Sequence, residues 1–432
     1  MKKIWMPLLL ALVLCTTTLS LVSAAQSKTL IHWSRELFQE ERKQAVIARA
    51  KEFEKLNPDV KVQVEFLPFQ ESYTKTMAAI AAGNPPEVGE QGPDLVTQFA
   101  SAQELAPLND VVRGIGKDKF IPMAKDAWAT IKGKVYGIPW YLETRVLFYR
   151  KDILEKEGIK PPTTWAEWLT AMKALTKDTD KDGQIDQWGS VVSGNGPGLG
   201  QLWMILGATN GGMILNRQGK VVINSKPMKE ALQWLVDLKL KHQVMPPAVL
   251  QYTQQDVSKM FELGKAPMLI MSGNDILNIK RNRPELASKI GAVKIPINRP
   301  GQTSRSFLGG FQLFVFAKSK NPDDAKKFVK YMFAEPFYSN FLKYAEGGAL
   351  PVLKQVANQP LYKDDPLVKV MMDQLPTAVR YGGPLYGNAP QLGEVEGRLL
   401  LTKAVQETLA GQKTVDKAVA DLEREIKALF EE

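Results

Sequence analysis

The sequence predicts an α/β protein in which central sheets are flanked by helices, and three consecutive segments carry this prediction. Residues 29–33 form an apolar run with a β-branched start, and residues 60–66 alternate apolar and polar side chains, as a half-buried strand does. Between them, residues 41–56 repeat apolar side chains on one face at helical spacing. The order strand, helix, strand favours parallel pairing of the two strands.

The ends of helices are also visible in the sequence. Asn57 and Pro58 end the first helix, because proline cannot continue it. Thr164 precedes an apolar run and Glu167 stands three residues further on, which is the pattern of a capping box. Similar patterns predict strands at 135–139, 145–150, 221–223, 267–271 and 311–317, and helices at 74–82, 164–175, 227–240, 323–333, 399–410 and 414–430.

The chain is too long for one compact core. It has 432 residues of ordinary globular composition, 44% hydrophobic and 24% charged, whereas single cores stop growing at roughly 250–300 residues. We therefore expect two lobes. No Ser/Gly-rich linker separates them, so ordered crossings of the chain must join them.

Two rare residue types exclude several kinds of chemistry. The chain contains two histidines, His32 and His242, which argues against histidine-rich metal sites and histidine-pair chemistry. Its single cysteine, Cys15, excludes a disulfide framework, a CxxC redox pair and cysteine-based zinc sites.

The N-terminus has the three parts of a secretory signal. Lys2 and Lys3 precede the apolar run 7–14, and the small residues Ser23–Ala25 precede Gln26. We therefore expect residues 1–25 to be a cleaved signal peptide and the mature protein to be periplasmic or secreted. The alternative is an uncleaved anchor, although the apolar run is short for a bilayer core of ~30 Å.

Cys15 raises another alternative, a lipid-modified cysteine. Bacterial lipoprotein signals resemble this region but carry Gly, Ala or Ser directly before the cysteine, where this chain has Leu14. Plain cleavage is therefore the favoured interpretation. No later segment reaches 18 uninterrupted apolar residues, so we expect a soluble mature protein.

The charge distribution argues against a nucleic-acid partner. The formal charge is +10; without Lys2 and Lys3 the 56 basic residues become 54 against 46 acidic ones, which gives +8. This excess is scattered and interleaved with acidic residues, as on a solvated surface.

Several segments match one known family, in its order and over nearly the whole mature chain. The strongest match runs from Gly133 to Pro139, continues through Thr144–Asp152 and ends at Pro161–Trp165. Further matches are the strand before Trp33 and the segments 53–66, 82–88, 309–311, 319–321 and 347–351. The chain resembles the family 1 extracellular solute-binding proteins of ABC importers, the broad group that includes maltose-binding protein.

The resemblance implies two α/β lobes of the periplasmic-binding-protein type, joined by three crossings near 144–149, 292–296 and 348–352. The N-terminal lobe would comprise residues 26–143 and 297–347, and the C-terminal lobe residues 144–296 and 348–432. The implied function is capture of a sugar or oligosaccharide in the interlobe cleft by hinge closure and its delivery to the permease subunits of an ABC transporter. We expect a monomer that is not an enzyme and requires no cofactor.

A sugar needs flat apolar contacts for its C–H faces and polar partners for its hydroxyls, because an unpaired buried hydroxyl costs ~1–3 kcal/mol. Residues of both kinds stand at the positions where the resemblance implies a cleft. Glu143 falls on a position that carries a sugar-binding Glu in maltose-binding protein. The full set of candidate ligand contacts is Trp33, Arg35, Glu36, Gln91, Asp94, Tyr141, Glu143, Arg145, Trp203, Asn274, Asp275, Phe311, Tyr344 and Tyr381.

Some of these residues have an alternative role. Trp33 and Trp203 could instead be core aromatics, and Glu143 and Arg145 could form a hinge ion pair. Related proteins often have an aromatic residue where this chain has Asp275, which argues against a close maltodextrin match. Trp203 follows the glycine-rich loop 194–200, which lacks the GxGxxG spacing of a phosphate cradle.

One acidic loop has the spacing of a calcium site. Asp178, Asp180, Asp182, Gln184 and Asp186 stand at positions 1, 3, 5, 7 and 9, and the glycine at position 6 permits the sharp turn. Position 12 is a glycine and not the expected bidentate Glu. A structural Ca²⁺ and a plain solvated acidic loop both remain open.

Two other functions compete with sugar binding. The charge of +8 and Arg145 keep a non-sugar or anionic small solute possible. Glu36 and Glu143 could in principle act as the carboxylate pair of a carbohydrate-active hydrolase, but the chain lacks an eightfold β/α order.

Overall fold

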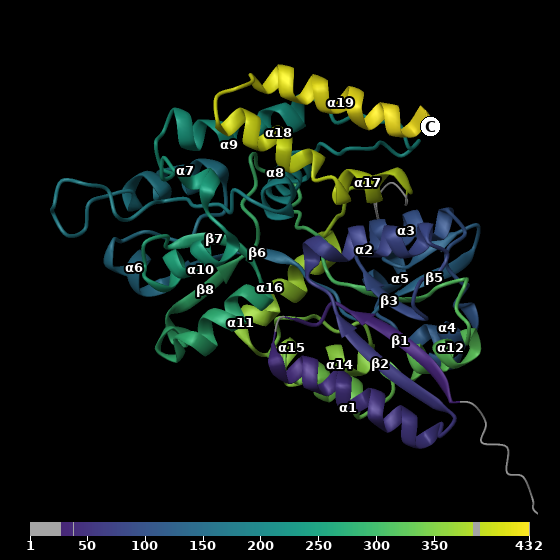
Figure 1. Cartoon of the computed structure of the whole chain (residues 1–432). Coiled ribbons are helices and arrows are strands. Elements are labelled where there is room, and N and C mark those ends of the chain that lie inside the picture. Colours follow the sequence, from purple (N-terminus) through teal and green to yellow (C-terminus); the bar gives the residue numbers. More distant parts are fainter. Residues whose placement is uncertain (1–26, 38, 383–388, 432) are drawn as a thin grey trace, which may run out of the picture.

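The structure, a computed structural model, describes residues 27–37, 39–382 and 389–431. The expected signal peptide and Cys15 lie outside this part of the chain. Two sheets organise the described residues, and Figure 1 shows them on opposite sides of the molecule. The six-stranded sheet has the order β2-β1-β3-β9-β5-β4 and the three-stranded sheet has the order β7-β6-β8.

The strands are β1 (Lys28–Ser34), β2 (Val60–Phe66), β3 (Val88–Gln91), β4 (Ala129–Ile131), β5 (Lys134–Pro139), β6 (Arg145–Arg150), β7 (Met268–Ser272), β8 (Ile290–Val293) and β9 (Gln312–Val315). The helices are α1 (Glu40–Leu56), α2 (Phe69–Ala81), α3 (Pro93–Ser101), α4 (Asn109–Ile115), α5 (Pro122–Asp126), α6 (Lys151–Lys156), α7 (Trp165–Leu175), α8 (Pro197–Thr209), α9 (Lys226–Leu240), α10 (Gln254–Glu262), α11 (Gly273–Asn282), α12 (Pro322–Met332), α13 (Phe337–Lys343), α14 (Lys354–Ala357), α15 (Pro360–Lys363), α16 (Pro366–Gln374), α17 (Gln391–Gly397), α18 (Leu400–Leu409) and α19 (Val415–Glu431). Short 3-10 turns lie at Lys117–Lys119, Val249–Gln251, Pro284–Lys289 and Leu375–Thr377.

The predicted strand–helix–strand unit is confirmed. β1 pairs with β2 in parallel over seven residues, from Lys28 opposite Val60 to Ser34 opposite Phe66. β1 also pairs with β3 in parallel, whereas β9 runs antiparallel to both β3 and β5. In the second sheet, β6 runs antiparallel to both β7 and β8. The α/β class predicted from the sequence is therefore correct.

Most of the predicted elements are present within one to two residues of their expected ends. The predicted capping box is confirmed, because Thr164 Oγ1 accepts a hydrogen bond from Glu167 N at 3.2 Å and Glu167 Oε2 accepts one from Thr164 N at 3.1 Å. The predicted strand at 221–223 is wrong. Val221 makes only an isolated bridge with Leu215, because so short a segment has no second partner to extend a ladder.

The two sheets define two lobes. In the N-terminal lobe, α1 packs on β2, α12 on β9, and α3 on β4 and β5. In the C-terminal lobe, α11 packs on β7, and α16 on β6 and β8, while α8, α9 and α18 pack together above that sheet (Figure 1). The exact residues at which the lobes divide stay a prediction.

Three segments lie outside both sheets, 140–144, 294–311 and 344–365, and we expect these connecting segments to join the two lobes. These segments are hydrogen-bonded to one another, because Leu142 pairs with Leu350 and Glu143 with Gly309. The close approach of the second segment to the first requires a glycine at position 310. There φ is +102°, and an added Cβ would lie 2.2 Å from the Tyr141 carbonyl oxygen. The three connecting segments are therefore hydrogen-bonded into one unit beneath the space between the lobes.

Candidate ligand-binding site

A cleft of about 650 Å³ lies between the two lobes. The N-terminal lobe lines it with the segments that follow β1, β2 and β3, and the C-terminal lobe with residues 193–198 and the first turns of α8, α10 and α11. The connecting segments contribute 143–145 and 307–311. Ligands of open α/β sheets bind beyond the carboxyl ends of strands, and this cleft has that position for β1, β2, β3 and β7.

Glu143 and Arg145 project from the segment that leads into β6. The carboxylate of Glu143 accepts a hydrogen bond from Asn274 Nδ2 at 3.3 Å. Burial raises the pKa of Glu143, against the opposing charge of Arg145. The Arg145 guanidinium lies 5.4 Å from the centre of the Phe307 ring, and its buried Nε has no hydrogen-bond partner among the described residues.

Arg35 and Phe311 form the apolar and cationic wall on the N-terminal side. Arg35 Nη1 donates to Ser72 Oγ at 2.7 Å and to Gln91 Oε1 at 2.8 Å. Its guanidinium lies 4.8 Å from the centre of the Phe311 ring, which also meets Tyr141 edge-on at 5.9 Å. Both lining side chains are therefore held in place from behind, as a preformed site requires.

Two carboxyl groups lie buried directly behind this wall. Glu36 is paired with Arg42 at 2.8 Å, and both side chains are fully buried. Glu90 Oε2 accepts hydrogen bonds from Ser34 Oγ and Arg35 N, each at 3.0 Å. Burial raises the pKa of Glu90 to about 8, and the neighbouring Glu36 charge adds to this effect. The Glu90 carboxyl therefore keeps its proton at neutral pH, which avoids a second negative charge beside Glu36.

A buried ion triad closes the cleft near α3 and α17. Arg380 Nη2 donates to Glu396 Oε1 at 2.7 Å, and Arg380 Nε donates to Asp94. Arg380 Nη1 also donates to the carbonyl oxygen of Leu308 at 3.1 Å. Burial raises the pKa of Asp94 to about 6, although Arg380 opposes the shift. The triad joins the C-terminal part of the chain to the N-terminal lobe beside the cleft.

The C-terminal wall consists of helix beginnings. Thr253 caps α10 with a capping box, and Ser272 caps α11 in the same way, with Asp275 Oδ2 accepting from Ser272 N at 3.0 Å and Ser272 Oγ at 2.8 Å. Gln201, in the first turns of α8, is only 4% exposed, and its Oε1 has no partner among the described residues. These groups offer hydrogen-bond donors and acceptors from the second lobe.

Comparison with known proteins identifies the family to which this two-lobed arrangement belongs. The family model described as bacterial extracellular solute-binding protein matches residues 39–336, which is more than half of the chain. The chain belongs to this family.

Relatives of this solute-binding protein include the diacetylchitobiose-binding protein DasA of Streptomyces coelicolor, which is 28% identical over 70% of this chain and 68% of its own length. A solved ABC transporter solute-binding protein of Thermotoga lettingae, bound with α-D-tagatose, is 25% identical with a TM-score of 0.80, covering 93% of this chain and 100% of its own. The GacH receptor of Streptomyces glaucescens, solved unliganded and with acarbose, is 25% identical with a TM-score of 0.79, covering 94% and 99%. The expected resemblance and the two-lobed fold are therefore confirmed.

The structure brings together ten of the expected ligand contacts in this solute-binding protein, in two layers. Lining the cleft itself are Arg35, Glu143, Arg145, Asp275 and Phe311. Directly behind these side chains, or behind their partners, are Glu36, Gln91, Asp94, Tyr141 and Asn274. The residues of the second layer support those that face the cleft.

Four expected contacts lie away from the cleft surface, and local packing explains each position. Trp33 donates from Nε1 to Glu65 at 3.0 Å and lies against Lys75. Trp203 is fully buried in α8 and donates to the Met228 carbonyl oxygen at 2.9 Å, so it is a core aromatic and not a stacking platform. Tyr344 is 42% exposed at the end of α13. Tyr381 is buried edge-on against the cleft-lining Phe307 at 5.9 Å, so it lies behind the cleft wall and not on its surface.

The sequence interpretation missed part of the cleft. Arg380 and Glu396 carried no local signal, because their partner Asp94 is almost 300 residues away in the chain. The loop 194–200 was considered only as a phosphate cradle, although its residues 195–198 line the cleft. Phe307, Thr253 and Gln254 also line the cleft. The alternative role of Glu143 and Arg145 as a hinge ion pair is not seen, since no ion pair within 4.0 Å joins these two described side chains, and the buried Arg145 Nε has no partner among the described residues.

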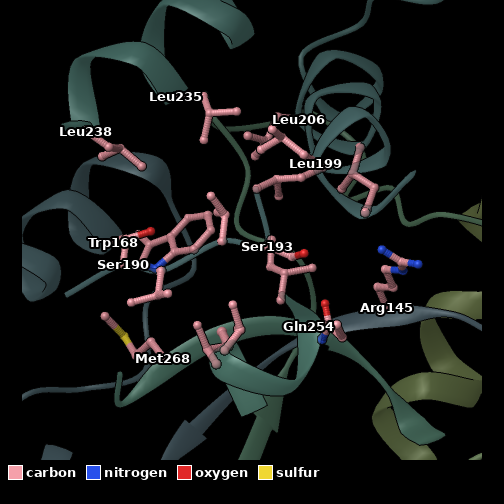
Figure 2. Close-up of a pocket in the computed structure, with 18 of the residues that line it drawn as sticks. Arg145, Trp168, Ser190, Ser193, Leu199, Leu206, Leu235, Leu238, Gln254 and Met268 are labelled. Carbon is pink, nitrogen blue, oxygen red and sulfur yellow. The ribbon is translucent and has the colours of Figure 1, made fainter. Parts of the chain in front are cut away.

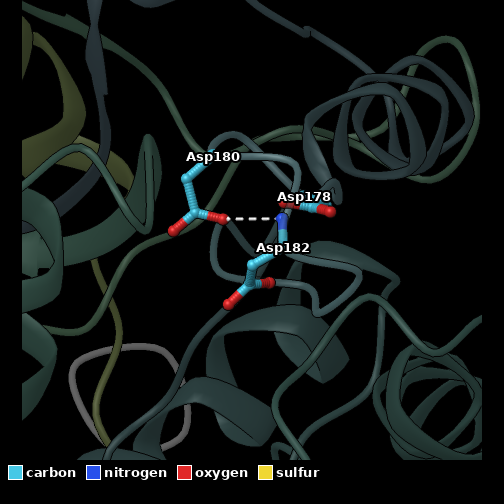
Figure 3. Close-up of side chains that lie close together, drawn as sticks. All are labelled: Asp178, Asp180 and Asp182. Atoms are coloured by element: carbon cyan, nitrogen blue, oxygen red, sulfur yellow. Dashed lines mark hydrogen bonds between the residues drawn. The ribbon is translucent and has the colours of Figure 1, made fainter.

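The acidic loop lies between α7 and α8 in the C-terminal lobe, and none of its residues lines the cleft. Carboxylate oxygens of Asp178, Asp180 and Asp182 lie within 4.8 Å of one another (Figure 3). Asp182 N donates to Asp180 at 3.2 Å, and Gly183 N donates to Asp178 at 2.8 Å. Asp186 is not one of the clustered carboxylates and accepts from Thr179 N at 2.7 Å.

Proposed function

We propose that this solute-binding protein captures a neutral saccharide in the interlobe cleft and releases it unchanged to the permease subunits of an ABC transporter. The observation that carries the proposal is the composition of the cleft walls. Phe311, Phe307 and the half-exposed Leu37 offer apolar surface, while Glu143, Arg145 and Gln201 offer hydrogen-bonding groups. A saccharide presents this combination of C–H faces and hydroxyls. The named ligands of GacH and of the Thermotoga protein, acarbose and tagatose, support the proposal.

The charges of the cleft favour a neutral ligand over an anion. Arg380 is neutralised by Asp94 and Glu396. The two other lining cations, Arg35 and Arg145, share the lining with the carboxylates Glu143, Asp275 and Glu71. An anionic ligand would therefore meet at least as much negative as positive charge.

The hydrolase alternative paired Glu36 with Glu143, and these two residues do not both line the cleft. Glu36 does not line the cleft; its side chain is fully buried and paired with Arg42. A glycosidase needs two carboxyl groups that flank the scissile bond. Because the chain also belongs to a family of solute-binding proteins, we infer that it binds its ligand without catalysing a reaction.

The proposal is tested by thermal shift and calorimetry against neutral saccharides, sugar acids and polyols. Binding to the folded state raises the melting temperature with ligand concentration, so at least one neutral saccharide should raise it in a saturable manner. Recovery of the bound saccharide after incubation should give it back intact. If only sugar acids stabilise the protein, its ligand is an anionic solute and not a neutral saccharide. If cleavage products appear, the protein is an enzyme.

We also propose that residues 1–25 are removed on export and that the mature protein acts outside the cytoplasm as a monomer. Of the helices in the described part of the chain, none combines the length and the apolar character that a membrane span requires. Mass spectrometry of the protein recovered from the periplasm or medium should give an N-terminus at Gln26. A lipid-modified N-terminus at Cys15 would contradict this.

We propose further that the acidic loop holds a structural calcium ion. The convergent oxygens of Asp178, Asp180 and Asp182 fit a hard cation, which prefers carboxylate ligands. The bidentate ligand at position 12 is missing, because Gly189 stands there. Calcium would stabilise this loop and would take no part in ligand binding.

A further inference from the structure

A second, smaller cavity adjoins the cleft inside the C-terminal lobe. We call it the side pocket; its volume is about 50 Å³. The side pocket lies between α7, α8, α9, α10 and β7, with Trp168, Leu206, Leu235 and Met268 among its lining residues (Figure 2). Five residues line both the side pocket and the cleft: Arg145, Ser193, Gly198, Gln254 and Ile270. The two spaces therefore share one wall.

The side pocket is suited to an apolar group more than to water. Its volume is several times the roughly 10–15 Å³ that one water occupies, but a water also needs two to four polar partners. Most of the lining side chains are aliphatic or aromatic. Of the polar ones, Arg145, Ser193 and Gln254 lie on the shared wall, whereas Ser190 lies near Trp168 (Figure 2). The aliphatic and aromatic walls therefore favour an apolar group, and the polar side chains can bind a polar atom attached to that group.

One unpaired donor belongs to a residue that lines this pocket. Trp168 is 4% exposed, and its Nε1 is buried with no hydrogen-bond partner among the described residues. The Trp168 ring is fixed by packing against Trp234 at 5.2 Å, and Trp234 in turn packs against Trp165 at 4.9 Å. An unsatisfied buried donor is costly, so a guest that carries a hydrogen-bond acceptor gains more here than a bare methyl group.

We propose that the side pocket receives an acetyl group carried by the saccharide whose ring lies in the cleft. The methyl group matches the apolar walls, and the carbonyl oxygen supplies the acceptor that Trp168 lacks. Arg145, which lines both spaces, stands between the ring and its substituent. This inference rests on the proposed function and adds to it the chemical class of the ligand, an acetylated sugar.

Matched sugars test the inference directly. D-Glucose and N-acetyl-D-glucosamine, and the β-1,4-linked disaccharides of each, differ only in the acetamido group that replaces a hydroxyl. Burial of one methyl group is worth about a fourfold change in affinity and a new hydrogen bond adds to this, so calorimetry should show at least about fivefold tighter binding of the acetylated members.

Filling the side pocket should remove this preference. In Leu235→Phe the larger side chain would fill the side pocket from α9, and in Leu206→Phe it would fill the pocket from α8. We call these two variants the fillers; the second is used if the first does not fold. We expect the acetylated and parent sugars to bind either filler within about twofold of each other. Leu240→Phe makes the same change at a half-exposed position of α9 and should keep the native preference.

The possible outcomes separate the two proposals. Equal binding of the paired sugars to the native protein overturns the inference and leaves saccharide binding intact. If both fillers still prefer the acetylated sugars, the acetyl group binds elsewhere and the inference is also overturned. Failure of every saccharide to bind removes the proposed function and the inference together.

Discussion

Glu143 is the residue on which the polar half of the cleft depends. Its carboxylate lies beside the connecting segments. Asn274 donates a hydrogen bond to it, and an added Cβ at Gly309 would lie 2.8 Å from its Oε2. The close approach of Gly309 and the hydrogen bond from Asn274 restrict the carboxylate to one position. A preformed acceptor of this kind binds a hydroxyl with little loss of side-chain entropy.

Replacing Glu143 should weaken saccharide binding strongly. We expect Glu143→Ala to lower affinity by at least ~1.5 kcal/mol, because a hydrogen bond to a charged group is lost. Glu143→Gln keeps the shape and should lose less. Calorimetry with the saccharide found in the thermal-shift panel measures both, and an unchanged dissociation constant for the alanine variant would exclude Glu143 from the site.

Glu90 should make stability depend on pH. Its pKa of about 8 in the folded protein lies above the ordinary value of 4.5, so between these values the folded state holds a proton that the unfolded state has lost. The stability contributed by this group is therefore full below about pH 4.5 and falls as pH rises through about 8. Glu90→Gln mimics the protonated form, and the drop in melting temperature between pH 5 and 8.5 should shrink in this variant.

The exposed Glu71→Gln provides the matched control for Glu90. It removes one carboxylate without touching the buried pair, so its pH profile should follow that of the native protein. If Glu90→Gln also leaves the profile unchanged, the carboxyl is ionised in the folded protein at neutral pH.

Single residues of the site were predictable where they follow a strand closely in sequence. Arg35 follows β1, and Glu143 and Arg145 flank the beginning of β6, so strand patterns placed them near a sheet edge. Arg380 was not predictable in this way, because its partner Asp94 is brought to it only by tertiary folding. Trp203 was predicted as a ligand contact but lies in the core. An aromatic side chain after a glycine-rich loop has the same local sequence pattern whether it faces a ligand or the core.

At the scale of elements, the beginning of α7 is fixed by its cap. Thr164 Oγ1 accepts from Glu167 N, and Thr164 also pairs with Ile297 from the second connecting segment. The cap therefore sets both the start of the helix and its place beside the connection between lobes.

Loss of this cap should destabilise the protein measurably. We expect Thr164→Ala to lower the free energy of unfolding by ~1 kcal/mol, because one orphan N–H of the helix loses its acceptor. Thr170→Ala removes a threonine from an exposed position of the same helix, where its hydroxyl bonds only to the Ala166 carbonyl oxygen. Urea unfolding should separate the two variants, and equal losses would contradict the capping argument.

The acidic loop gives a second prediction at this scale. If calcium binds Asp178, Asp180 and Asp182, EDTA should lower the melting temperature modestly and added calcium should restore it, because a cation that binds only the folded state stabilises it. Asp180→Asn should abolish the response. No change with EDTA and none with calcium would identify the loop as a plain turn.

Regular elements were more predictable than their pairing. Alternation and helical spacing located β1, α1 and β2 closely, because each pattern reflects burial of one face. The antiparallel pairing of β6 with β7 and β8 was not predictable, since these strands are separated by more than a hundred residues and their apolar sequences carry no register. The segment 221–223 had the composition of a strand but no neighbouring edge to join.

The whole molecule is held in its present arrangement by contacts that run between the lobes. Arg42 in α1 donates to Asn274 Oδ1 in α11 at 3.2 Å, and Gln39 donates to Asn278 at 3.4 Å. Farther out, Arg281 in α11 bonds to Glu41 at 2.9 Å. The first of these contacts differs from the others, because Asn274 also bonds to Glu143 and so connects the position of the lobes to a group in the cleft.

Asn274→Ala should therefore reduce saccharide affinity although Asn274 does not line the cleft. We expect about a tenfold loss, because Glu143 loses the donor that holds it and Arg42 loses its acceptor in the opposite lobe. Asn278→Ala is the matched control, since it removes an interlobe contact from the same helix that does not reach Glu143. Calorimetry should separate the two variants, and small-angle scattering should show a smaller ligand-induced compaction only for Asn274→Ala. Equal affinities would mean that lobe contacts and cleft geometry are independent.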